Sequence, residues 1–160
     1  MAYTIQSPLV GAQPIGVTDT VQNHPLGTRV FATDPTYGAG EFVYLKGVAS
    51  TAVGDVVVYD QYAGTSTRAV AGSRGPAAVA MSANVASQYG WYQVSGAAVV
   101  NCGTVAANAP LFATATAGSV DDAVVTGDKI DGCVSRTANG TPGTGKLIAQ
   151  ICHPSMNGNG

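Results

Sequence analysis

The stretch VASTAVGDVVVYD, Val48–Asp60, sets a run of three valines and a tyrosine directly after Gly54 and Asp55. β-branched and aromatic residues favour extended strands, whereas glycine and aspartate favour turns. The apolar run is also shorter than an ordinary helix, and it shows no helical spacing. It therefore predicts a short β-strand that is entered through a tight turn at Gly54.

A second stretch, TVAANAPLFAT at 104–114, has the same order of small residues, turn and apolar strand. Asn108 stands there in the place of Gly54. Both residue types tolerate a positive φ better than others, so the same tight turn is expected in both stretches. Two matches do not establish a repeat array, and we interpret them as similar hairpin entries within one domain.

Similar short runs fill the chain from Glu41 onward, and turn residues separate nearly all of them. Charged residues make up only 10% of the sequence, too few to cover the outer faces of several helices. The sequence therefore predicts an all-β fold, a single compact β-barrel or β-sandwich of about ten short strands over residues 29–154. The expected strands lie at 41–45, 55–59, 67–70, 77–81, 90–94, 97–100, 110–114, near 119–125, at 130–135 and at 146–153.

Residues 1–28 form a different kind of segment, with prolines at positions 8, 14 and 25 and no regular periodicity. Proline lacks the N–H that a sheet ladder needs, so we expect an extended N-terminal arm here. The arm is too apolar for a solvated tail, and we expect it to contact either its own domain or a neighbouring subunit. The candidate contact residues are Tyr3, Ile5, Leu9, Val10, Ile15 and Val17. Residues 155–160 are predicted to be a disordered tail.

Charge and hydropathy argue against several classes of partner. The net charge is −2, and the seven Lys and Arg residues form no basic stripe of the kind that binds nucleic acid. No apolar run is long enough to cross a bilayer, and the N-terminus lacks the features of a signal peptide, so we expect synthesis in a cytoplasm and no membrane partner. The three cysteines lack zinc-site spacing and are interpreted as buried, reduced thiols in strands.

The segment Gly140–Leu147, GTPGTGKL, matches seven of the eight positions of a phosphate-binding loop. Such a loop needs a buried strand before it, a helix after it and a Ser or Thr magnesium ligand at the last position. Here the following residues are β-like, and Leu147 occupies the last position. We interpret the segment as a polar hairpin loop between two strands.

Other residue types with catalytic potential are also assigned structural roles. His24 and His153 each precede a proline and are expected to be surface or edge residues. The acidic residues at 121, 122, 128 and 131 do not have the spacing of a calcium loop and are expected to be solvated. The sequence therefore predicts no catalytic, cofactor-binding or metal-ligating residue, and no enzyme.

Trp91 is interpreted as a core anchor whose indole N–H finds a carbonyl group. The alternative is a sugar-stacking platform, which would require Trp91, Tyr92, Tyr59 and Tyr62 to share one exposed face.

The run from Tyr89 to Pro154 resembles the capsid decoration, or cement, proteins of tailed bacteriophages. The matching segments are structural turns and strands, and the resemblance extends more loosely over 34–60. Asn108 is a departure from the family pattern, because similar proteins often have glycine there. The segments are GWYQVSG at 90–96, TVAANAPLF at 104–112, AGSVDD at 117–122, GDKIDGCVS at 127–135 and the Gly-rich loop before the final strand.

The resemblance implies a structural virion protein that binds the outer surface of an icosahedral capsid and stabilises the mature shell. Its expected partners are the major capsid protein and further copies of itself, with a trimer favoured and a dimer possible. It would be made in the host bacterial cytoplasm and act on the virion surface. The alternative is a β-sandwich carbohydrate-binding or adhesin module.

Overall fold

The computed structural model describes residues 2–9 and 11–158, and none of these residues is helical. The predicted all-β class is therefore confirmed. Within the described residues, no helix is available that could span a membrane. The strands are β1 Thr4–Ile5, β2 Arg29–Asp34, β3 Gly38–Lys46, β4 Val56–Asp60, β5 Thr65–Arg68, β6 Gly75–Ala80, β7 Tyr89–Asn101, β8 Pro110–Ala113, β9 Val120–Asp121, β10 Lys129–Ser135 and β11 Lys146–Met156.

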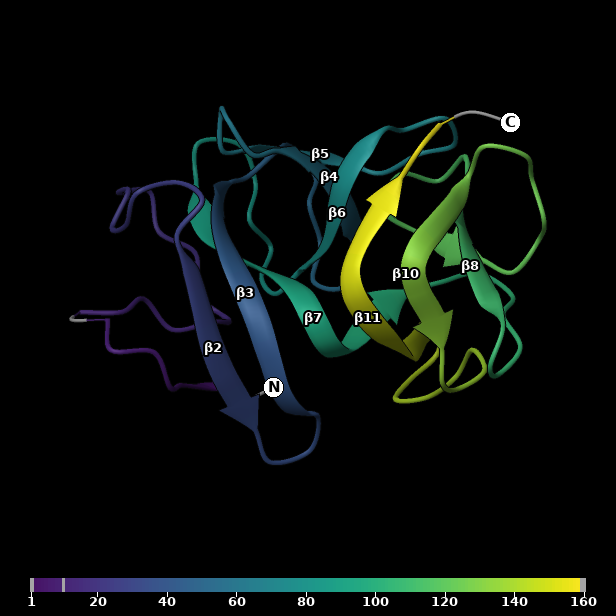
Figure 1. Ribbon diagram of the computed structural model, residues 1–160, viewed down its shortest axis with the longest axis horizontal. Helices are drawn as coiled ribbons and strands as arrows, with labels where there is room; N and C mark the ends of the chain where they lie inside the picture. The colour runs from purple at the N-terminus through teal and green to yellow at the C-terminus, as the bar shows by residue number, and fades with distance from the viewer. Residues whose placement is uncertain (1, 10, 159–160) are drawn as a thin grey trace.

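All eleven strands belong to one hydrogen-bonded network with the order β1-β2-β3-β5-β4-β6-β7-β11-β10-β8-β9. β7 also pairs with β3, and β6 also pairs with β11. β7 is the longest strand: its first half pairs with β3 and its second half with β11. It thereby connects β2 and β3 on the left of Figure 1 with β8, β10 and β11 on the right.

The strands after β3 form two units with the same pairing pattern. In the first unit β4 pairs with β5 and β6, and β6 pairs with β7; in the second unit β8 pairs with β9 and β10, and β10 pairs with β11. Each unit also has one parallel bridge back to the strand before it, Lys46 to Thr65 and Cys102 to Val120. β7 is the last strand of the first unit and the strand from which the second unit starts.

The two tight turns expected from the sequence are equivalent in the structure. Gly54 has φ 90° and Asn108 has φ 60°, so both adopt the left-handed conformation. Gly54 N–H donates to Ala80 O at 2.8 Å, and Asn108 N–H donates to Ser135 O at 3.1 Å. The similarity between 48–60 and 104–114 therefore reflects two related units, where we expected only two similar hairpin entries.

Several strands are buried on both faces, which explains their nearly continuous apolar sequences. Phe42 and Tyr44 of β3 contact a cluster that includes the arm, whereas Val43 and Leu45 face a second cluster with β4, β6 and β7. β4 lies between that second cluster and a third, larger one formed mainly by the second unit. The core is therefore divided into three clusters separated by strands.

The strands differ from the prediction in several places, among them β1 in the arm, which was not expected, and β9, which covers only Val120–Asp121 of the stretch near 119–125. β2 was not expected; its alternating burial places Val30, Ala32 and Asp34 inward. The runs expected at 90–94 and 97–100 form one strand, because Gly96, with φ 107°, bends the chain without ending it. β11 continues through Met156, which is buried and pairs with Ile130, so the predicted tail begins two residues too early.

Candidate functional site

The N-terminal arm lies on the outer face of β3 and β7 in its own chain. Ile15 is buried, with only 2% of its surface exposed, and it packs with Phe42, Tyr44 and Trp91. The arm follows the left side of the molecule beside β2 and β3 in Figure 1. The arm thus completes one of the three core clusters.

Gln13 holds the arm in place through hydrogen bonds from both its backbone and its side chain. Its carbonyl oxygen accepts from Trp91 Nε1–H at 2.8 Å, and its Oε1 accepts from the Tyr44 hydroxyl at 2.8 Å. Its Nε2–H donates to Val17 O at 2.6 Å and to Tyr89 O at 3.0 Å. A polar side chain can be buried here because its donors and acceptor all have partners.

The aromatic side chains beneath the arm form a compact group. Trp91 is fully buried, and its ring centroid lies 5.0 Å from that of Tyr44 in an edge-on arrangement. His24 lies 5.1 Å from the same tyrosine ring and accepts a hydrogen bond from Gln13 N–H at its Nε2. The prediction that His24 is a surface or edge residue was wrong, because the aromatic group and the Gln13 backbone enclose it.

The candidate contact residues of the arm face in different directions. Tyr3, Ile5 and Leu9 are partly buried against the same core cluster as Ile15, whereas Val17 is 47% exposed. Val10 lies outside the described residues. In the single chain, Val17 is therefore the exposed member of the described set.

Tyr3 anchors the beginning of the arm. Its ring meets the edge of Phe42 at a centroid distance of 4.9 Å, and its hydroxyl donates to Ala97 O at 3.3 Å. Burial, followed by the nearby charge of Asp34, raises the pKa of Tyr3 to about 12. The neutral phenol is therefore the form that this contact requires.

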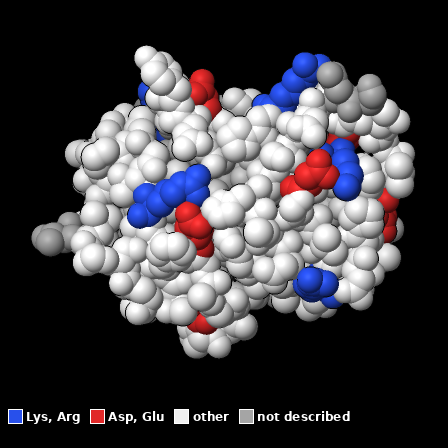
Figure 2. Space-filling view, in the orientation of Figure 1, with Lys and Arg blue, Asp and Glu red and all other residues white. Residues whose placement is uncertain are grey.

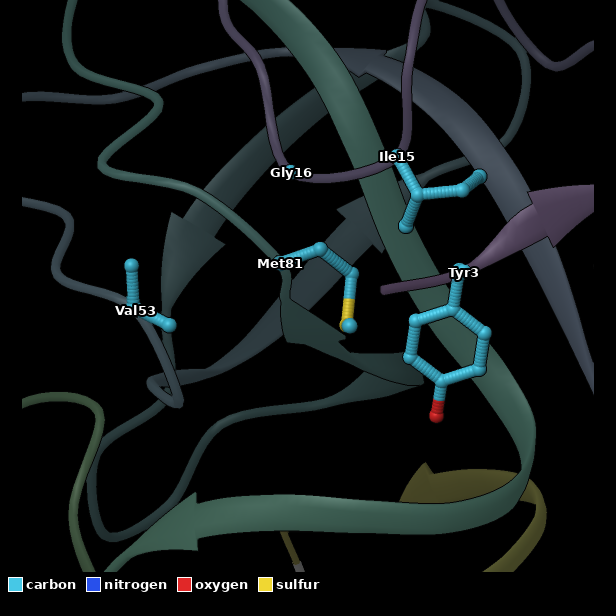
Figure 3. Close-up of a pocket in the computed structure, with 5 residues that line it drawn as sticks. All are labelled: Tyr3, Ile15, Gly16, Val53 and Met81. Atoms are coloured by element: carbon cyan, nitrogen blue, oxygen red, sulfur yellow. The ribbon is translucent and has the colours of Figure 1, made fainter. Parts of the chain in front are cut away.

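A hollow of about 240 Å³ separates part of the arm from the loop that precedes β4. Tyr3, Ile15 and Gly16 of the arm line it together with Val53 and Met81. Figure 3 shows Ile15 and Tyr3 on one side of Met81, with Val53 on the other. The lining side chains are apolar apart from the Tyr3 hydroxyl, so the hollow has no ionisable group other than this phenol.

The surface combines low charge with several exposed apolar side chains. Figure 2 shows a face on which blue and red residues are few, some of them side by side, with large uncharged areas between these groups. Tyr62, in the turn between β4 and β5, is fully exposed, and Val124 in the loop before β10 is 81% exposed. Other large exposed apolar side chains are those of Val21, Phe31 and Val125.

One ionic group lies where β2, β3 and β11 approach one another. Glu41 pairs with Arg29 at 2.8 Å and with His153 at 3.2 Å, and a second guanidinium nitrogen of Arg29 lies 3.4 Å from the Tyr59 hydroxyl. His153 is exposed, in agreement with the prediction for this residue, and has φ 43°, which is unusual for a residue with a side chain. Glu41 thus links the two sides of β7.

The segment Gly140–Gly145 is part of the loop between β10 and β11 and leads directly into a strand. The hairpin loop expected from the sequence is therefore confirmed. A phosphate-binding loop would need a helix at this position, which is absent from the described residues. The Lys146 amine points to Asn101 Oδ1, at 2.8 Å, and to Val53 O, at 3.4 Å.

The acidic residues have local structural partners. Asp122 accepts from Ala106 N–H, Asp121 accepts from Ala123 N–H and Asp131 pairs with Lys129. Asp128 is buried and accepts from Gly72 N–H, so it differs from the solvated carboxylate that we expected. Among the described residues, no three His, Cys, Asp or Glu side chains are grouped so as to hold a metal ion.

The cysteines fit the sequence interpretation only in part. Cys102 and Cys133 are buried free thiols, and burial raises the pKa of Cys133 to about 12. Cys152 is exposed, contrary to the prediction, because it lies on the outward face of β11, in alternation with the buried Ala149 and Ile151.

The four aromatic residues considered as a sugar platform do not share a surface. Trp91, Tyr92 and Tyr59 are buried in two different core clusters, and only Tyr62 is exposed. The Tyr92 hydroxyl lies 3.2 Å from Ser66 Oγ and accepts from Asn84 Nδ2–H at 3.1 Å. Three of the four rings therefore stabilise the fold.

Comparison of the sequence with protein-family models and with curated proteins gave no match.

Proposed function

We propose that this protein is a structural virion protein that binds the outer surface of an icosahedral phage capsid and stabilises the mature shell without catalysis. Exposed apolar side chains on an otherwise weakly charged surface carry the proposal. Tyr62 lies in the turn between β4 and β5 and Val124 in the loop before β10, and contact with a partner would bury both side chains. The sequence resemblance to decoration proteins supports the same function.

The partners are the major capsid protein and further copies of this chain, with a trimer favoured over a dimer. A symmetric oligomer contacts the shell at several points and gains avidity even where each contact is weak. A protein that binds only the mature shell stabilises that state by mass action. The chain is made in the host bacterial cytoplasm and acts on the virion surface.

The arm contributes to these contacts through its outward side. Ile15 and Gln13 point into the chain, whereas Val17 and Val21 are exposed and available to a neighbour. We further propose that β3, β5, β4, β6 and β7 form a small barrel, because each pairs with the next and β7 pairs back to β3. The arm covers one side of this barrel.

Sedimentation velocity tests the proposal with the purified protein alone and mixed with undecorated capsids. A discrete oligomer that co-sediments with capsids to a saturating stoichiometry is expected. A monomer that remains in the supernatant at all capsid concentrations would remove the proposal.

The exposed ring of Tyr62 gives one reason to keep the carbohydrate-binding alternative. A single exposed aromatic ring can stack on a sugar. The four aromatic residues considered above do not form a platform of several rings, because three of them are buried. Saturable binding on a glycan array that Tyr62→Ala removes, together with no capsid binding, would favour the alternative.

A further inference from the structure

An amine and a carboxamide face each other where the two long strands of the second unit meet. Lys146, the first residue of β11, is the cross-strand partner of Asn101, the last residue of β7. The Lys146 Nζ lies 2.8 Å from Asn101 Oδ1, and both side chains are partly buried. A nucleophile and an amide carbonyl group are thus held together by the register of the sheet.

A buried carboxylate lies on the other side of the same carboxamide. Asp55 Oδ1 accepts a hydrogen bond from Asn101 Nδ2–H at 2.8 Å. Asp55 is buried, and Arg68 Nε–H holds its second oxygen at 2.8 Å. The carboxylate is therefore fixed beside the nitrogen that an attack on the carboxamide would release.

The backbone of the tight turn holds the carboxamide in this position. Val53 O accepts from Asn101 Nδ2–H at 3.0 Å, and it lies 3.4 Å from Lys146 Nζ. A Cβ atom at Gly54 would come within 3.0 Å of Asn101 Oδ1, so a larger residue at this turn would crowd the group. Three elements, the turn, β7 and β11, thus converge on one amide.

We propose that Lys146 and Asn101 form an intramolecular isopeptide bond in a reaction promoted by Asp55. Holding two reacting groups in contact replaces a bimolecular encounter and accelerates reactions that are slow in free solution. A carboxylate next to the leaving nitrogen supplies the proton transfer that amide exchange requires. The hydrogen bonds described above hold Lys146 Nζ beside the oxygen, and Asp55 beside the nitrogen, of the same carboxamide.

In this reaction the neutral Lys146 amine attacks Asn101 Cγ and forms a new C–N bond. The Cγ–Nδ2 bond breaks, and Nδ2 leaves as ammonia. Nζ loses one proton and the departing nitrogen gains one; Asp55, which is hydrogen-bonded to Nδ2–H, assists the transfer at that nitrogen and is unchanged at the end. No oxidant or further reactant is needed, and the protein loses one molecule of ammonia.

The neighbouring thiol does not compete for the carboxamide. Cys102 follows Asn101 directly and is buried, and burial raises the pKa of its thiol although the positive charge of Lys146 lowers it. A protonated thiol is a weak nucleophile.

The intact mass of the wild-type protein after prolonged incubation tests the proposal. The expected mass is lower than that of the sequence by one ammonia. Trypsin should then leave residues 75–129 joined to residues 137–160, because the linked Lys146 is no longer cleaved. An unchanged mass after prolonged incubation would overturn the proposal.

Succinimide formation at any of the three Asn-Gly pairs, at 139–140, 157–158 and 159–160, would also release ammonia, so variants must distinguish the two reactions. Lys146→Arg keeps a positive charge but cannot form the bond, and it should restore the full mass. Lys129→Arg, a matched change at an exposed lysine, should leave the cross-link intact. A wild-type digest in which residues 75–129 and 137–160 are not joined would refute the isopeptide bond, whatever ammonia is lost from Lys146→Arg.

Asp55→Asn tests the role of the carboxylate. The expected result is a slower mass loss with the cross-link still at the same two residues, and circular dichroism establishes that the variant is folded. An unchanged rate in a folded variant would remove Asp55 from the reaction.

Discussion

Replacing Ile15 by alanine tests whether the arm is part of its own domain. The side chain is 2% exposed and packs with Phe42, Tyr44 and Trp91. The change removes three carbon atoms, and each buried methylene contributes about 0.8 kcal/mol, which gives roughly 2.4 kcal/mol before any cavity effect. The space left behind adds to this, so we expect a loss of about 3 kcal/mol in the free energy of unfolding.

Urea unfolding followed by tryptophan fluorescence suits this measurement, because Trp91 is the single tryptophan and lies in the same cluster. Ile15→Ala should lower the midpoint and leave the slope of the transition unchanged. Val17→Ala is the matched control on the same arm. Because Val17 is 47% exposed, its replacement should change stability by no more than about 0.5 kcal/mol.

Two results would refute this reasoning. Equal stability of Ile15→Ala and the wild type would mean that the arm does not pack on the domain in solution. A midpoint that rises with protein concentration, and that loses this dependence in Ile15→Ala, would mean that the arm packs on a neighbouring copy instead.

Three further predictions concern other parts of the molecule. Asp55→Ala should destabilise the protein by about 3 kcal/mol in urea unfolding, because it leaves Arg68 and the Asn101 amide without their buried partner; a change below about 1 kcal/mol would contradict this. Tyr62→Ala should leave stability unchanged and weaken capsid co-sedimentation severalfold, whereas unaltered capsid binding would remove Tyr62 from the interface. The pKa of Tyr3 is raised from 10.0 to about 12 in the folded state, so the phenol stays neutral there. The contribution of Tyr3 to the free energy of unfolding should therefore be complete below pH 10 and be lost as pH rises toward 12. Wild type and Tyr3→Phe should therefore differ in the pH dependence of unfolding in this range, and parallel profiles would contradict the buried position of the phenol.

The fold class and most strands could be predicted from local composition, because short apolar runs between turn residues specify strands directly. Even the positive φ at Gly54 and Asn108 followed from residue type. β2 was missed because its inward positions hold only two apolar side chains, Val30 and Ala32, followed by Asp34, which is too few to stand out as a strand. The Ser95–Gly96 pair looked like a break, yet the chain only bends there, because β3 and β11 continue the hydrogen bonding on either side.

The site was harder to predict because it depends on contacts between distant residues. Nothing in the spacing of the arm tells Ile15, which is buried, from Val17, which is exposed, because the arm has no regular periodicity. Likewise, the partners of Lys146 come from residues 53 and 101, and only the sheet register brings them together. The glycine-rich sequence before Lys146 resembles a phosphate-binding loop, whereas in the structure the Lys146 amine contacts the side-chain amide of Asn101.

The double use of β7 has a consequence for synthesis on the ribosome. The first unit has all its strands once the first half of β7 has emerged, but the second half of β7 then has no partner until β11 has been made. During that interval Ala98 and Val100 are not yet covered by Leu147 and Ala149, which belong to the same core cluster. The edge of β7 that later pairs with β11 is then open to other chains. A nascent chain that stops before residue 146 should therefore aggregate or be degraded, whereas a chain that contains β11 covers this edge with its own strand.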